Sequence, residues 1–154
     1  MFGDLMANNL LEAVVEFLQT VMADELDATS ITPKVFSDYI IESTAPYVVI
    51  ADISETYSFQ SGSPPTFLAD GVMPITFFAT TKAQAMALGR SCVLHFLQEE
   101  DAGDPFLVFS GGYIEEFRPG NGSSATISDI SVGQPTIFAW TVQFHYKEQF
   151  STIS

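Results

Sequence analysis

The pattern of apolar and polar positions is clearest from residue 72 to residue 97, where a strand pattern gives way to a helix pattern. Residues 72–80 read VMPITFFAT, a run typical of a strand. Thr81 follows as the expected N-cap of a helix, and Gln84 stands three residues later, the spacing at which each residue satisfies a backbone N–H of the other. At 100° per residue this helix has an apolar face, made up of Ala85, Leu88, Cys92 and Phe96.

Most of the remaining surface of this helix is apolar as well. Further apolar side chains extend around the cylinder, namely Ala83, Met86, Ala87, Val93, Leu94 and Leu97. The clear polar strip consists of Gln84, Ser91, His95 and Gln98. One sheet cannot cover so much apolar surface, so we expect a neighbouring subunit to cover the rest.

The first half of the chain predicts one helix followed by short strands. Asp4 is the expected N-cap of a helix that runs to about Met22, with Met6, Leu10, Val14, Phe17 and Val21 along one side. A short strand is expected near residues 35–40, and YVVIADIS at 47–54 is a clearer one. Residues 55–70, which include SGSPP, lack obvious periodicity and are interpreted as a polar linker.

The second half predicts three more strands. PFLVFS at 105–110 is followed by a glycine turn at Gly111 and Gly112 and by YIEEF at 113–117, which indicates a hairpin. Residues 120–135, rich in glycine and serine, are expected to form a long loop. In TIFAWTVQFHY at 136–146, strict alternation puts five residues on one face: Phe138, Trp140, Val142, Phe144 and Tyr146.

This order of elements predicts an α+β fold. The expected sequence is helix, three strands, helix, three strands, which favours a mainly antiparallel sheet with both helices packed on one face. There is no internal repeat and no linker that would divide the chain. We therefore expect residues 1–154 to form a single domain.

Composition and charge exclude several classes of function. Nineteen Asp and Glu stand against five Lys and Arg, for a net charge of −14, so the chain would repel a nucleic-acid duplex rather than bind it. The charge also suits solubility in a chain that is 47% hydrophobic. No apolar run approaches the roughly 20 residues of a membrane helix. No basic residue precedes Lys34, so we expect no signal or transit peptide, and the single Cys92 excludes a disulfide framework.

The residues that could carry chemistry do not form a recognisable site. His95 and Glu99 are four positions apart in the second helix, but a zinc site needs a further ligand, and the other histidine, His145, stands on a distant strand. The acidic run EEDAGD lacks the alternating ligand pattern of a calcium loop. We therefore predict that the protein is not an enzyme and holds no metal or cofactor.

One charge feature is specific enough to suggest an interface. No acid occurs between Asp70 and Glu99, whereas Lys82 and Arg90 both fall on the second helix. We predict that they contact acids of an identical copy, an arrangement in which apolar neighbours assist. The alternative is that they are ordinary surface residues. The predicted subunit interface consists of Lys82, Met86, Arg90 and Leu94.

The succession of these segments resembles the tail terminator (tail completion) proteins of long-tailed bacteriophages. The resemblance rests on the N-terminal amphipathic helix, APYVVIADIS, ITFFATTKAQAMALG and TIFAWTVQFHY, which together cover nearly the whole chain in order. The residues that match the start of the family's central helix are Ala79, Thr80, Gln84, Ala85 and Leu88. The chain departs from the family in Pro74 and in the longer segments at 55–70 and 119–135.

The resemblance implies a virion structural protein without a catalytic centre. Such proteins form a ring, commonly of six subunits, at the head-proximal end of the tail tube, where the ring ends tube polymerisation and joins the head connector. The implied partners are further copies of the chain, the tail tube protein and a head-completion or connector protein, with DNA passing through the lumen without specific binding. The implied location is the virion neck, and the host cytoplasm during assembly.

Three alternatives remain open from the sequence. The chain could be another neck component, such as a head-completion or connector ring protein. It could be a non-viral acidic binding domain or enzyme subunit, which would require a pocket with convergent polar groups. It could also be a monomeric adaptor whose helix binds a partner helix.

Overall fold

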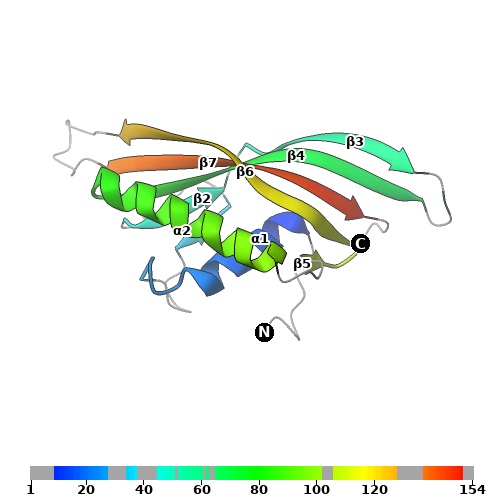
Figure 1. Ribbon diagram of the computed structural model, residues 1–154, viewed down its shortest axis with the longest axis horizontal. Helices are drawn as coiled ribbons and strands as arrows, with labels where there is room; N and C mark the ends of the chain where they lie inside the picture. Colours follow the sequence, from blue (N-terminus) through cyan, green and yellow to red (C-terminus); the bar gives the residue numbers. More distant parts are fainter. Residues whose placement is uncertain are drawn as a thin grey trace.

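The protein folds as a long, twisted sheet with two helices beneath it (Figure 1). The computed structural model describes residues 9–27, 34–37, 45–50, 52–60, 62, 65–101, 106–127 and 137–150. The elements in chain order are α1 (Leu10–Val21), β1 (Val35–Phe36), β2 (Tyr47–Ile50), β3 (Ser54–Gln60), β4 (Thr66–Ala79), α2 (Lys82–Asp101), β5 (Phe106–Phe109), β6 (Gly112–Ile127) and β7 (Ile137–Phe150). Neither helix has the length and apolar character that a membrane span needs, as far as the described residues go.

The seven strands form one sheet in the order β1-β2-β4-β7-β6-β5, with β3 pairing with β4 beside β2. The β1–β2 pair is parallel and every other pair is antiparallel. The predicted α+β class with a mainly antiparallel sheet is therefore confirmed. The predicted order of elements lacks one strand, because β3 was assigned to a linker.

Both helices pack on the same face of the sheet, as predicted. The side chains that α1 and α2 bury join one core with alternate residues of the long strands. At its centre the ring of Phe96 on α2 lies 4.8 Å from that of Phe17 on α1, 4.4 Å from that of Phe117 on β6 and 5.1 Å from that of Phe144 on β7. These four rings join both helices to the sheet, so burial of Phe96 couples the two layers.

The two helices begin at capping residues, of which one was predicted correctly. Thr81 caps α2, since its hydroxyl accepts a hydrogen bond from the Gln84 backbone N–H at 3.1 Å. The predicted cap Asp4 lies outside the described residues, and the cap of α1 is Asn9, whose side chain accepts from the Glu12 N–H at 2.9 Å. Both side chains satisfy backbone donors that the first helical turn leaves without partners.

Two predicted loops are wrong over most of their described length. Residues 54–60 and 66–72 pair as an antiparallel hairpin, so the expected linker at 55–70 is mainly strand. The expected loop at 120–135 is strand as far as Ile127, paired with β7, and residues 128–136 lie outside the described residues. Polar residues form these strands because the long neighbouring strands β4 and β7 supply hydrogen-bond partners that a local pattern does not reveal.

The alternation predicted for the last strand is confirmed. Val142, Phe144 and Tyr146 are buried on the face of the sheet that carries the helices, whereas Gln143 and His145 are exposed on the opposite face. Towards the other end of β7, Trp140 lies against both Gly89 on α2 and Gly122 on β6, and a Cβ at either glycine would overlap its indole ring. Small residues at these two positions therefore let α2 lie over this end of β6.

Candidate subunit interfaces

The outward side of α2 is an exposed stripe that is mostly apolar. Leu94 is 58% exposed and Leu97 is 42% exposed, and Arg90 lies on the same side of the helix. The stripe, called here the α2 stripe, consists of Ala83, Ala87, Arg90, Leu94 and Leu97, positions that recur at helical spacing. Large apolar side chains that stay exposed together on one element indicate a contact surface.

The structure brings together only part of the predicted interface. Arg90 and Leu94 lie at the centre of the α2 stripe, and Lys82 is exposed in the first turn of the helix. Met86 is half-buried at the margin of the stripe. Leu97, which was not among the predicted interface residues, is more exposed than Met86 and extends the apolar stripe.

The polar strip of α2 lies along the flank of the helix, between its buried face and the α2 stripe, and Gln98 in this strip is exposed. Gln84, Ser91 and His95 are half-buried, and the His95 Nε2 lies 3.3 Å from Glu25 Oε1 in the turn that follows α1. Glu99, four residues further along the helix, is exposed, and the contact with Glu25 is one that helical spacing does not reveal. His95 thus joins this flank of α2 to the turn after α1, and the α2 stripe is left on the side opposite the buried face.

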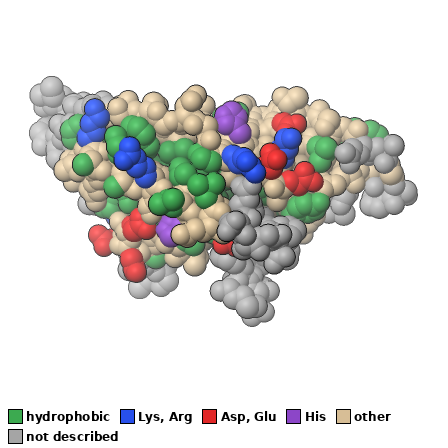
Figure 2. All heavy atoms as spheres, in the orientation of Figure 1, with side chains coloured by type: hydrophobic (Ala, Val, Ile, Leu, Met, Phe, Trp, Pro, Cys, Tyr) green, Lys and Arg blue, Asp and Glu red, His purple; other side chains and the backbone are tan. Residues whose placement is uncertain are grey.

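The basic residues of α2 have no acidic partner in the part of the chain that the structure describes. No ion pair joins Lys82 or Arg90 to a described acid. Figure 2 shows basic side chains in a row over the upper part of this face, with hydrophobic side chains among them. Acidic side chains lie beside the basic ones at the right and form a separate group at the lower left. Towards the left of this face, positive charge and apolar surface therefore lie together.

A second exposed apolar surface lies on the β3–β4 hairpin. Tyr57 is 63% exposed and Phe59 is 61% exposed, both on β3. The Phe59 ring packs edge-on against Phe67 of β4, with centroids 5.5 Å apart, and Phe67 stacks on Phe150 of β7 at 5.4 Å. The sequence signal was the alternation of Glu55, Tyr57 and Phe59 with small polar residues, which was overlooked because it adjoins SGSPP.

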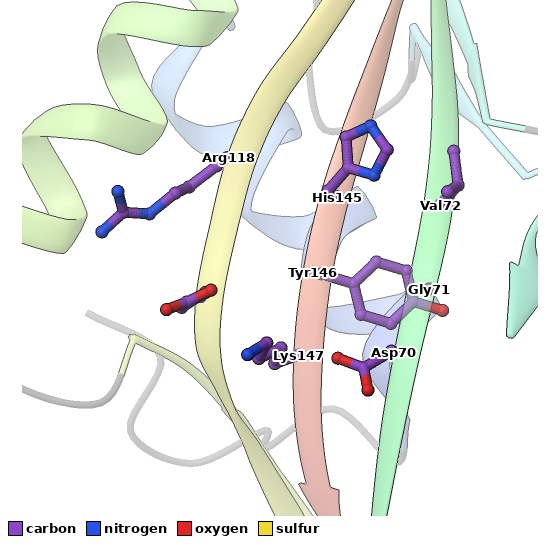
Figure 3. Close-up of a pocket in the computed structure, with 8 residues that line it drawn as sticks. Asp70, Gly71, Val72, Arg118, His145, Tyr146 and Lys147 are labelled. Atoms are coloured by element: carbon purple, nitrogen blue, oxygen red, sulfur yellow. The ribbon is translucent and has the colours of Figure 1, made fainter. Parts of the chain in front are cut away.

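A cluster of tyrosines and carboxylates anchors β3 to the sheet. Glu55 accepts hydrogen bonds from two phenols, from Tyr57 at 2.8 Å and from the buried Tyr146 on β7. Burial and the hydrogen bond to Glu55 both raise the pKa of Tyr146, and the Glu55 carboxylate also raises the pKa of Tyr57. Tyr146 reaches Glu55 across β4 because Gly71 has no side chain in its path. Figure 3 shows the Tyr146 ring beside Gly71.

Glu148 in the same cluster gives the fold a pH dependence that one substitution tests. Burial and the nearby Glu55 raise its pKa from 4.5 to about 7. Between these values the folded chain binds more protons than the unfolded chain, so the free energy of unfolding falls as the pH rises from 4.5 to 7. Glu148→Gln is expected to flatten this fall and to stabilise the protein at pH 8 by on the order of 1 kcal/mol, a figure reduced because the carboxyl is only half-buried.

The measurement is urea unfolding of the wild type and the variant at several pH values from 4 to 8. Glu115→Gln is the matched control, because it removes the same charge from an exposed position of β6. Equal slopes for wild type and Glu148→Gln across the window would contradict the role of Glu148.

The face of the sheet opposite the helices carries mixed charges. A shallow groove of about 250 Å³ is lined there by side chains from three adjacent strands, and Figure 3 shows Asp70 on β4, His145 and Lys147 on β7 and Arg118 on β6. Lys147 is flanked across the strands by Asp70 and Glu116. Because acids alternate with the basic groups, this face offers no continuous positive path for a nucleic-acid backbone.

The described residues contain no group of three or more His, Cys, Asp or Glu side chains that could hold a metal ion. The one cysteine, Cys92, is buried in the core, and burial raises the pKa of its thiol well above the usual value. A buried thiol of this kind packs as a small apolar group.

Comparison with known proteins gives a shared fold. The chain is similar to a chain in a solved structure described as "Virion of native gene transfer agent (GTA) particle", with a TM-score of 0.53 and 15% sequence identity. The similarity covers 88% of this chain and 91% of that chain. No protein-family model and no curated protein sequence matches. At this identity the likeness establishes the fold, which extends over nearly the whole of both chains.

Proposed function

We propose that this protein is a structural component of a phage-like virion, and specifically a subunit of the ring that ends the tail tube and joins it to the head connector. The observation that carries the proposal is the shared fold with a virion protein over 88% of this chain. The finer role rests on the resemblance of the sequence to tail terminator proteins. The role is structural rather than catalytic, and no cofactor is required.

Two separate exposed surfaces support assembly into a ring. The α2 stripe and the Tyr57–Phe59 surface of β3 belong to different elements, so each copy offers two unlike surfaces to its neighbours. Contacts between unlike surfaces of identical subunits are heterologous, and they produce rings when the rotation closes. The proposed partners are thus further copies of the chain, then the tail tube protein on one side and a connector protein on the other.

The charge distribution supports passage of DNA without adhesion. The net charge of −14 disfavours duplex binding, and the helix-free face of the sheet places Asp70 and Glu116 beside its basic residues. A duplex that passes such a surface finds no run of cations that could replace its counterions. This property suits a ring through which a genome moves.

The decisive experiment adds the purified protein to tail tube protein of the same virion during polymerisation. Tube length and tube ends are then measured by negative-stain electron microscopy. We expect tubes to stop growing and to carry a ring at one end. Continued growth with no ring on the tubes, together with binding to the portal-side connector, would instead identify the alternative neck component.

A further inference from the structure

Strand β3 and the second half of β6 each have an outer edge that no described residue covers. β3 pairs with β4 on one side only, and the 119–127 part of β6 pairs with β7 on one side only. Residues 56–59 of β3 and residues 120–125 of β6 are all exposed. We call these segments the β3 edge and the β6 edge.

Both edges lack the lysine and arginine side chains that commonly keep a free strand apart from others. Strand β3, SETYSFQ, contains one charged residue, Glu55, whose carboxylate is held by Tyr57 and Tyr146. Residues 120–125 of β6 contain no charged residue and no proline, and the strand has a register shift between Pro119 and Gly122. Proteins usually protect a free strand with charge, proline or a covering segment, because an open edge is a template for another strand. Two edges without basic residues in one subunit therefore favour a partner strand for each.

The strand directions make the two edges complementary. The order β3-β4-β7-β6 is antiparallel throughout, so β3 and β6 run in opposite directions. A second copy that is placed with its β3 edge against the β6 edge of the first copy continues the same antiparallel alternation. Two β3 edges or two β6 edges could meet only about a two-fold axis, which would close a dimer and leave the other pair open.

The β3 edge of one copy can pair with the β6 edge of the next only if the two copies are shifted relative to each other along the strand direction. β5 extends the β6 side of the sheet beside residues 112–114, and β2 with β1 extends the β3 side beside residues 75–78 of β4. These extensions lie at opposite ends of the long strands. When the β3 edge meets the β6 edge, each extension lies beyond the end of the neighbouring copy, so the extensions do not collide.

The shift between neighbouring copies along the strands can be compared with the strand tilt of a closed barrel. Across the paired strands, the middle of β3 at Tyr57 aligns with Glu148 on β7, and the middle of the β6 edge at Ser123 aligns with Thr141. These positions are about seven residues apart, roughly 23 Å at 3.3 Å per residue, whereas four strand spacings amount to about 19 Å. The strands would therefore tilt by about 50°, somewhat more than the roughly 35–45° of closed barrels.

The exposed side chains also suit this junction. Tyr57 and Phe59 lie in register with Glu148 and Phe150, on the face of the sheet that carries the helices. At the β6 edge this face is covered by α2, since Trp140 lies between Gly122 and Gly89. The two rings of the incoming copy thus arrive beside α2, where Arg90 offers a cation and Leu94 an apolar contact.

We propose that the β3 edge of each copy pairs in antiparallel register with the β6 edge of the next copy, so that one sheet runs continuously around the assembled ring. This inference rests on the proposed function, because it names the surface through which the ring subunits join. It assigns the exposed Tyr57 and Phe59 to the same junction as the α2 stripe.

Disulfide cross-linking between copies tests the pairing. Ser58 and Ser123 both lie on the helix-free face, as does Ala125, whereas Ser124 lies on the helix face. Within one copy β3 and β6 are three strand spacings apart, about 14 Å, beyond the roughly 7 Å Cα limit of a disulfide. Cys92 is buried and stays in place. The test proteins are Ser58→Cys combined in turn with Ser123→Cys, with Ala125→Cys and, as the control, with Ser124→Cys.

We expect oxidation to link the assembled protein into covalent multimers for Ser123→Cys or Ala125→Cys, but not for Ser124→Cys. Light scattering before oxidation establishes that each variant assembles like the wild type. If the rings form but neither helix-free pair cross-links, the edge pairing is overturned and the ring function stands. If the wild type stays monomeric with and without tail tubes, both the pairing and the proposed function are overturned.

Discussion

Replacing Leu94 with aspartate is expected to dissociate the assembled protein into monomers. Leu94 is 58% exposed at the centre of the α2 stripe, so it contributes little to the core of the single chain. At a subunit contact, burial of a leucine is worth about 1.5–3 kcal/mol, and an aspartate there must also be desolvated without a partner. Together these terms weaken each contact by roughly 100-fold or more. Light scattering across a range of protein concentrations measures the change.

The control for this variant is Ser110→Asp, which adds the same charge at an exposed turn between β5 and β6. Both variants should retain the circular dichroism and the unfolding midpoint of the wild-type monomer, since surface changes usually alter stability by no more than about 0.5 kcal/mol. If Leu94→Asp assembles as well as Ser110→Asp, the α2 stripe is not a subunit contact.

Replacing Phe96 with alanine is expected to have the largest effect on the fold itself. The ring is fully buried and packs against Phe17, Phe117 and Phe144, which come from α1, β6 and β7. Removing it leaves a cavity where both helices meet the sheet, and buried Phe→Ala changes cost about 3–5 kcal/mol. Urea unfolding, followed by circular dichroism at a concentration where the protein is monomeric, measures the loss.

Leu97→Ala is the matched control, because it truncates the next residue of the same helix where the side chain is 42% exposed. Its loss of stability should be well under half that of Phe96→Ala. Equal losses would mean that the aromatic cluster does not join the helices to the sheet, and they would contradict the core described above.

The spacing of apolar residues was sufficient to predict those segments whose structure depends on contacts within the segment. The buried face of α2 and its Thr81 cap follow from spacing alone, because helix contacts are made within a few residues. The alternation of β7 is equally explicit, since its buried residues face a core of helices while the others face solvent. These two segments fixed the class of the fold before any pairing was known.

The errors concern features that depend on distant partners. The second half of β6 reads as a glycine- and serine-rich loop, and it is a strand because β7 extends beside it. The residues of β3 likewise gain their structure from β4. The contact between His95 and Glu25 was also not predicted, because the two residues are seventy positions apart in the chain. Sequence spacing contains no information about such contacts.

The candidate interface was predicted only in part, because the α2 residues can be recognised from local sequence and the β3 edge depends on distant pairing. Arg90 and Leu94 were identified from charge and apolar surplus on one helix, both of which are local properties. The β3 edge was missed because its polar residues resemble a linker, although Tyr57 and Phe59 two positions apart were a usable signal. These rings are exposed because β3 lies at the edge of the sheet and pairs only with β4 (Figure 1).

The measurement that tests the central claim most directly is the mass of the purified protein by light scattering across concentration, alone and with tail tubes, with negative-stain imaging of any assembled species. The account predicts a closed ring with a central hole, either free in solution or at the end of a tube. A protein that remains monomeric under both conditions, or that forms only two-fold dimers, would contradict it.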